Sequence, residues 1–106
     1  MKLFSQMSEE ELRLEIERLQ LEEARARRFG MTSEAEVLRQ RRALARSYLT
    51  DAKRIRTGDV YEVEDHPNRF HVEKINGVMA WGKWEGRWET VAIPISLIRI
   101  PEEDDR

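Results

Sequence analysis

The chain has 106 residues, of which 38% are charged, and its formal net charge is −2. This length allows one compact domain, or two small elements that share a core, and excludes two independently stable domains. The nearly balanced charge argues against a protein that coats nucleic acid with its whole surface. The absence of cysteine excludes disulfides, thiolate metal sites and cysteine nucleophiles.

Signals for membrane insertion or export are not evident in the sequence. No run approaches the ~18 apolar residues that a membrane span needs. Residues 1–11 become acidic where a signal peptide would stay apolar, so we expect the N-terminus to be retained as written. With the absence of cysteine, these features predict a cytoplasmic protein without a membrane partner.

The first predicted element is a helix over residues 9–29. Ser8 and Glu11 have the spacing of a capping box at its start, and Gly30 is placed to end it. Apolar residues fall on two sides of this helix. One side faces a partner helix, and the other must be covered by the C-terminal half or by a second chain. The second side consists of Leu14 and Leu21.

A second helix is predicted from a repeat of the capping-box pattern at Ser33 and Glu36 to about Leu49. Only a few residues around Gly30 separate the two helices, so they must be antiparallel neighbours. Residues 50–58 then form a polar link to the second half of the chain.

From Thr57 the apolar period changes from 3.6 to 2, which indicates strands. The expected strands cover residues 60–64, 69–75, 78–84, 87–93 and 99–100, with a 3₁₀ turn at 94–98. The predicted fold is α+β: an antiparallel helical hairpin with a basic linker (residues 1–56) packed on a small five-stranded SH3-like β-barrel (residues 57–106). We expect one cooperative unit.

Two-residue turns at 76–77 and 85–86 fix which strand residues share a face. This register puts Trp81 in the barrel core and Trp84 opposite Arg87, where a cation–π contact is worth about 0.5–1 kcal/mol. The expected core residues are Phe70, Val72, Met79, Trp81, Trp88 and Ala92. An apolar cluster then faces outward and needs a cover from the first helix: Ile75, Val78, Ala80, Val91 and Ile93. A bulge at Gly82 would shift the faces.

Four stretches carry a family resemblance: FSQMS before the first helix, SYL at the end of the second, INGVMAWG at the central hairpin and AIPISLI near the end. In this combination the chain resembles the YfhH-like family of small uncharacterised bacterial proteins over essentially its whole length. The resemblance implies a helical hairpin joined to an SH3-like barrel in a cytosolic protein, with a link to transcriptional regulation. It supplies no catalytic or ligand residues.

Catalytic and metal-binding patterns are weak in this sequence. His66 lies in a predicted turn and His71 on a strand, without the helical spacing of a paired metal ligand, so we expect no metal. The serines lack a recognisable His and Asp partner, and the five glycines are too scattered for a phosphate loop. The sequence therefore predicts a protein that is not an enzyme and holds no cofactor.

The distinctive feature is a basic segment over residues 39–56. Residues 30–56 carry seven Lys and Arg against three acidic residues, whereas residues 57–106 carry six against eleven. Three arginines at i, i+3 and i+7 line one side of the second helix, and the linker continues the stripe. The candidate nucleic-acid-binding residues are Arg39, Arg42, Arg46, Lys53, Arg54 and Arg56. Alternatively, these cations pair with Glu15, Glu22 and Glu23 of the first helix or with the acidic barrel.

Two functions follow from these features. The first is a small nucleic-acid-associated or transcription-related regulator whose basic stripe binds phosphates. The second is a protein-interaction adaptor or a self-associating module, such as a homodimer, that uses an apolar helix or barrel face. The candidate partner-binding residues are Leu14, Leu21, Trp84 and Arg87. The identity of a partner, the oligomeric state, a small-molecule ligand and any nucleic-acid sequence preference stay open.

Overall fold

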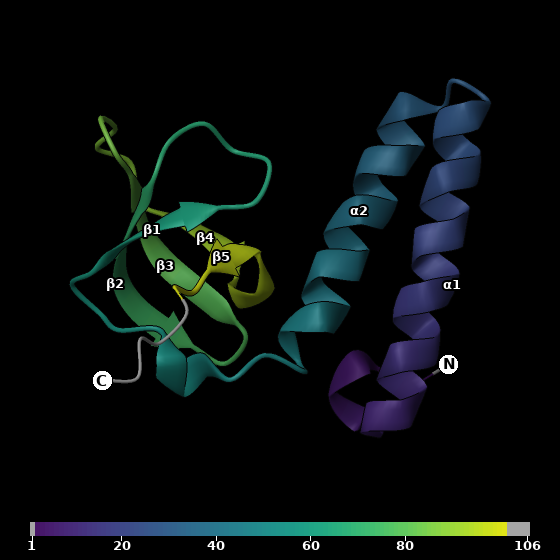
Figure 1. Ribbon diagram of the computed structural model, residues 1–106, viewed down its shortest axis with the longest axis horizontal. Coiled ribbons are helices and arrows are strands. Elements are labelled where there is room, and N and C mark those ends of the chain that lie inside the picture. The colour runs from purple at the N-terminus through teal and green to yellow at the C-terminus, as the bar shows by residue number, and fades with distance from the viewer. Residues whose placement is uncertain (1, 102–106) are drawn as a thin grey trace. The chain divides into compact units, whose positions relative to one another are not determined.

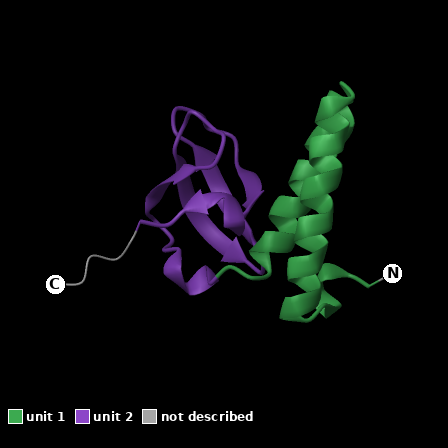
Figure 2. Ribbon diagram, turned by 45° about the vertical axis from the view of Figure 1, so that its right-hand side comes forward, with its two compact units in different colours: residues 1–50 green, residues 51–106 purple. Residues whose placement is uncertain are grey.

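A computed structural model describes residues 2–101 of the chain (Figure 1). The fold is α+β, with two α-helices followed by a five-stranded antiparallel sheet. The chain separates into two compact units, Met1–Thr50 and Asp51–Arg106 (Figure 2). The basic linker therefore belongs to the second unit, where the backbone N–H of Arg56 donates to the Tyr61 hydroxyl at 2.9 Å.

The first helix, α1 (Glu9–Arg28), begins and ends as its sequence predicts. Ser8 Oγ accepts from the Glu11 N–H at 3.1 Å and Glu11 returns a bond to the Ser8 N–H at 2.9 Å, which confirms the capping box. Gly30 follows the helix with φ +75°, and the Met31 N–H donates to the Ala26 carbonyl at 2.8 Å. This is the Schellman arrangement, in which glycine takes the left-handed position. A 3₁₀ turn, η1 (Phe4–Gln6), precedes the helix.

The second helix, α2 (Thr32–Ser47), begins one residue before the predicted cap at Ser33. That capping prediction is wrong because the left-handed Gly30 already turns the chain, and the Met31 carbonyl accepts the first helical bond from the Ala35 N–H at 2.9 Å. Ser33 therefore lies inside the first turn. The short connection makes the two helices antiparallel neighbours, as expected (Figure 1).

The seam between the helices is built from leucine and alanine. Leu12, Leu19 and Ala26 recur every seven residues along α1 and are all buried, as are Ala35 and Ala43 of α2. Seven-residue spacing is the period of a helix–helix contact, and alanine side chains let two helix backbones approach closely. None of the helices in residues 2–101 is long and apolar enough to cross a membrane.

The second unit consists of five antiparallel strands in the order β4-β3-β2-β1-β5. The strands are β1 (Val60–Val63), β2 (Phe70–Asn76), β3 (Met79–Trp84), β4 (Val91–Pro94) and β5 (Ile98–Arg99). Two 3₁₀ turns complete the unit: η2 (Ala52–Arg54) before the first strand and η3 (Ile95–Leu97) before the last. Among the described residues no ladder joins the edge strands β4 and β5, so the sheet is open.

The central hairpin turns one residue later than predicted. Asn76 pairs with Met79, which leaves Gly77 and Val78 as the turn, and Gly77 has φ +62°. Glycine with positive φ at the first of two turn positions is typical of a type II′ hairpin. Moving the turn by one residue changes the register by two, so Lys74 lies opposite Trp81 and the strand ends next to the turn keep their predicted faces. The predicted core position of Trp81 is wrong: the residue is 40% exposed.

A bulge in β2 changes the register by one residue and so exchanges the face of β3 that lies opposite the first half of β2. Lys74 pairs with Trp81 but Val72 pairs with Gly82, so Glu73 is the extra residue. The shift therefore occurs opposite Gly82 and not at Gly82 itself. An added Cβ on Gly82 would collide with the backbone carbonyl of His71 in the neighbouring strand, so only glycine fits at this position of β3.

The buried residues of the sheet differ accordingly from the predicted core. Phe70 and Val72 are fully buried as expected, whereas Trp88 is 83% exposed. Of the cluster that was expected to face outward, Ala80 and Ile93 are buried and Ile75, Val78 and Val91 are half-buried.

The predicted turn at Glu85 and Gly86 is present, with the Arg87 N–H donating to the Trp84 carbonyl at 2.9 Å and Gly86 at φ +84°. The fourth strand begins only at Val91, because residues 87–90 do not pair with β3 and Trp81 lies opposite Ala92 in place of Thr90.

Candidate functional site

The arginines of α2 are largely engaged within the helical hairpin. Arg42 donates from Nε and Nη2 to Glu23 Oε1 at 3.1 and 2.9 Å, and Arg27 donates to Glu23 Oε2 at 2.8 Å. Arg39 donates to Glu36 at 3.0 Å, and Arg46 is half-buried. The pairing of Arg42 with the first helix was the alternative interpretation of the basic stripe. The stripe on the second helix is therefore not a free cationic surface.

Glu23 is the buried centre of this ion-pair cluster, with 7% of the residue exposed. Burial by itself raises the pKa of a carboxyl group, but the hydrogen bonds from Arg27 and Arg42 outweigh it and hold the pKa of Glu23 below its ordinary value. Arg42 thus compensates a buried charge. Its guanidinium has a structural role before any contact with a ligand.

The basic residues of the linker are arranged differently. Lys53, Arg54 and Arg56 are exposed and line one hollow of about 350 Å³, together with Asp59, Tyr61, Ile100 and Pro101. Among the described residues none of the three cations has an ion pair or a side-chain hydrogen bond. Three free cations therefore surround one concave surface of the second unit.

Local structure places these cations. The Asp51 side chain accepts from the Lys53 N–H at 3.0 Å and caps η2, the turn that carries Lys53 and Arg54. Arg56 is fixed through its backbone by the Tyr61 hydroxyl, while Ile55 between them is buried. The side chains of the basic residues are left to project outward because the backbone carries the structural bonds.

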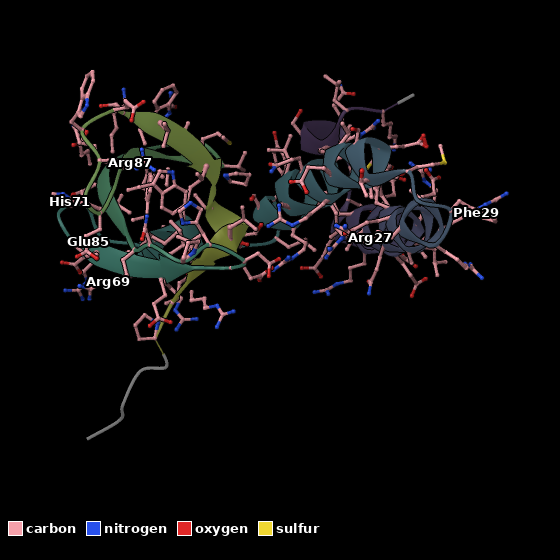
Figure 3. All side chains as sticks on the ribbon, turned by 90° about the horizontal axis from the view of Figure 1, so that it is seen from above. Arg27, Phe29, Arg69, His71, Glu85 and Arg87 are labelled. Atoms are coloured by element: carbon pink, nitrogen blue, oxygen red, sulfur yellow. The ribbon has the colours of Figure 1, made fainter. Side chains whose placement is uncertain are left out.

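Trp84 has a structural role that its sequence does not reveal. Its ring stacks on His66 with a centroid distance of 3.5 Å and an interplanar angle of 8°, and meets Phe70 edge-on at 5.0 Å. The Arg87 backbone N–H donates to the Trp84 carbonyl at 2.9 Å, and the Arg87 side chain is exposed on the loop (Figure 3). The sequence predicts the turn that holds His66, but no local signal indicates that this turn brings the imidazole onto Trp84.

The candidate partner-binding leucines lie uncovered on the helical hairpin. Leu14 is 62% and Leu21 is 69% exposed, so α2 does not cover them. Phe29 at the tip of the hairpin is 67% exposed and projects outward (Figure 3). An apolar side of α1 is therefore present as predicted. The expectation that it packs on the second half of the chain stays a prediction.

Comparison with known proteins decides the family. Residues 2–99 match the model of the family described as "Protein of unknown function (DUF1811)". The chain belongs to this family. A relative from Bacillus subtilis (strain 168), "Uncharacterized protein YfhH", is 32% identical over 102 residues, which covers 95% of this chain and 98% of the relative. The predicted resemblance to YfhH-like proteins is confirmed.

Within residues 2–101 no three His, Asp or Glu side chains gather closely enough to hold an ion. His66 Nδ1 accepts from the Asn68 N–H at 3.1 Å, and the imidazole packs on Trp84. The basic hollow, by contrast, is a concave surface within the described residues at which three cations have no ion pair.

Proposed function

We propose that this DUF1811 protein is a non-enzymatic, cytoplasmic binding protein that contacts nucleic-acid phosphates through the basic hollow of its second unit. The observation that carries this proposal is the set of three exposed cations, Lys53, Arg54 and Arg56, without ion-pair partners among the described residues around one hollow of about 350 Å³. Phosphate binding by such cations gains free energy from released counterions. Two arginines add planar donors that fit phosphate oxygens in pairs.

The location differs from the one that the sequence favours. Arg42 compensates the buried Glu23, and Arg39 is paired with Glu36. Only the linker half of the predicted basic stripe combines exposure, free charge and concavity. We therefore assign the phosphate contact to Lys53, Arg54 and Arg56, and leave the helical arginines to the stability of the hairpin.

The fold of the second unit agrees with a binding role. Five short antiparallel strands with a 3₁₀ turn before the last one fit an SH3-like barrel, and we propose this relationship for residues 57–106. Barrels of this kind serve many binding functions, so the fold supports a binding protein without choosing its ligand. A role in transcription is the regulatory form of this proposal.

The test is a fluorescence anisotropy titration of the full chain against labelled nucleic acid at low salt. We expect micromolar affinity, which corresponds to about −8 kcal/mol. The triple variant K53Q/R54Q/R56Q should bind at least about tenfold more weakly, because three counterion-releasing contacts are lost. The matched control R25Q/R41Q/R87Q removes the same charge from exposed arginines outside the hollow and should change affinity much less. Equal losses in the two variants would contradict the proposal.

A second candidate function is self-association through α1. It is favoured by the exposure of Leu14 and Leu21, seven residues apart on one side of the helix. If this side binds a second copy, sedimentation should show a dimer that L14Q/L21Q converts to a monomer. A wild-type chain that stays monomeric at high concentration would exclude this alternative.

A further inference from the structure

We infer that the basic hollow is one end of a continuous groove in the second unit, and that this groove takes single-stranded nucleic acid. The inference rests on the proposed function and names its substrate class. Binding of a single strand requires a longer surface than the linker cations provide. The structure supplies that surface along β1 and β5.

Three hollows adjoin along these strands. The first, with the linker cations, shares Tyr61, Ile100 and Pro101 with a second hollow of about 340 Å³. The second shares Glu62, Arg69 and Arg99 with a third of about 430 Å³, which reaches the turn after β1. Because each neighbouring pair has lining residues in common, the hollows form one groove from η2 to residues 65–68.

Positive charge continues along the groove. Arg99 lines the second and third hollows and has no ion pair among the described residues. Arg69 lines the same two hollows and is held by Glu85 at 2.9 Å, as the two side chains beside each other show (Figure 3). A chain of phosphates that enters at Arg54 therefore meets further cations, which is the arrangement of a backbone-tracking groove.

Carboxylates in the groove limit its affinity. Asp59, Glu62 and Asp65 line it, against five basic side chains. Glu62 pairs in register with Arg99 across β1 and β5, so a negative charge lies beside that cation. Carboxylate oxygens repel phosphates but accept hydrogen bonds from base amino groups. The groove is thus suited to a strand whose bases enter it, and less to phosphates alone.

An aromatic stack stands at the far end of the groove. His66 lines the third hollow, is exposed, and has its ring plane fixed by the parallel Trp84 ring at 3.5 Å. Trp84 is in turn supported by Phe70 at 5.0 Å. A base that enters the third hollow can extend this stack, which is how single-strand binding proteins hold unpaired bases without sequence preference.

The shape of the groove favours a single strand over a duplex. Each hollow is at the lower end of the range for small-ligand sites, about 300–1,000 Å³, and can take a group of nucleotide size. A duplex keeps its bases stacked inside a convex rod, so it reaches the rim of the groove but does not place a base on His66. Only a single strand uses the cations and the aromatic stack together.

The first test compares a labelled 12-nucleotide oligothymidine with a duplex of the same length, using the full chain. We expect the single strand to bind at least about fivefold more tightly, and R99Q to weaken it about threefold while R87Q leaves it unchanged. Equal affinity for duplex and single strand, or equal effects of R99Q and R87Q, would overturn the groove.

The second test isolates base stacking with an abasic 12-mer that has the same phosphates. H66A should weaken oligothymidine binding about threefold or more and leave abasic binding unchanged, with circular dichroism confirming an intact fold. Loss of both equally would overturn the stacking role. If neither nucleic acid binds, both the groove and the proposed function fail. If both bind through K53Q/R54Q/R56Q-sensitive contacts and R99Q is silent, only the groove fails.

Discussion

The contact between Arg42 and Glu23 offers a sharp test of how the helical hairpin is stabilised. The change Arg42→Ala removes two hydrogen bonds, at 3.1 and 2.9 Å, from the Oε1 oxygen of a carboxylate whose side chain is only 10% exposed. Arg27 still binds the other oxygen at 2.8 Å, so Glu23 keeps one cationic partner. The variant therefore leaves half of a buried carboxylate without donors.

The expected cost follows from this geometry. Breaking a fully buried ion pair costs about 3–5 kcal/mol, and leaving a buried polar atom unsatisfied costs about 1–3 kcal/mol. Because Arg27 remains and the Arg42 side chain is itself 23% exposed, we expect a loss of about 2 kcal/mol in the free energy of unfolding. Arg41→Ala, on an exposed arginine of the same helix, should stay within about 0.5 kcal/mol of wild type.

Urea denaturation followed by circular dichroism measures this difference, with an unchanged m-value as the condition for comparing midpoints. If Arg42→Ala is as stable as Arg41→Ala, the cluster does not stabilise the hairpin and Arg42 is again available as a phosphate ligand. If Arg42→Ala shows the expected loss of stability, weaker nucleic-acid binding by an Arg42 variant reports on folding and not on a lost contact.

Further predictions follow from burial and charge. The pKa of Glu23 is lowered in the folded chain, so its stabilisation is present above the ordinary carboxyl pKa and is lost as pH falls through the lowered value; Glu23→Gln should flatten this acid limb in pH-dependent melts. Trp84→Ala should cost about 2–3 kcal/mol and Trp81→Ala less than about 1 kcal/mol in denaturant titrations, and the reverse ranking would contradict the observed register. Gly82→Ala should lose about 1–3 kcal/mol in the same assay, because its Cβ meets a backbone carbonyl of β2; wild-type stability would show that the strands can separate without cost. Neutralising the four acidic residues at 102–105, which follow directly on the groove residue Pro101 in the sequence, should raise affinity for oligothymidine in anisotropy titrations, and unchanged affinity would place their charge outside the reach of the groove.

Much of the fold was predictable because its signals are local. The capping box at Ser8 and the glycine at position 30 involve bonds between residues a few positions apart, and both are seen. Two helices, five strands and the 3₁₀ turn before the last strand follow from the same kind of pattern. The capping prediction at Ser33 failed because the spacing of Ser33 and Glu36 does not show that the turn at Gly30 has already set the start of the helix.

The strand faces were not predictable from the hairpin sequence. The two-residue turn can be formed by Asn76 and Gly77 or by Gly77 and Val78, and both choices satisfy local turn preferences. The faces are set by packing elsewhere, where Ala80 and Ile93 enter the core and a bulge at Glu73 changes the register of the strands by one residue. The single extra residue at Glu73 was enough to move Trp81 from the predicted core to the surface.

The candidate site likewise has a part that the sequence predicts and a part that it does not. Lys53, Arg54 and Arg56 are close in sequence, so their cluster was visible as a basic run. Arg99 and His66 join the groove only through the pairing of β1 with β5 and the turn after β1, and neither has a periodic or motif signal. The engagement of Arg42 depended on which glutamate faced it across the hairpin, and charge counting alone left both outcomes open.

The most direct test of phosphate binding by the second unit is the salt dependence of oligothymidine affinity. We predict a linear fall of log K with log salt for the wild-type chain, and a slope smaller by about two for K53Q/R54Q/R56Q, because each lost single-strand phosphate contact removes about 0.7 of a counterion. R25Q/R41Q/R87Q should retain the wild-type slope. An equal slope in the wild-type chain and K53Q/R54Q/R56Q, with both proteins folded, would show that the basic hollow does not contact phosphates.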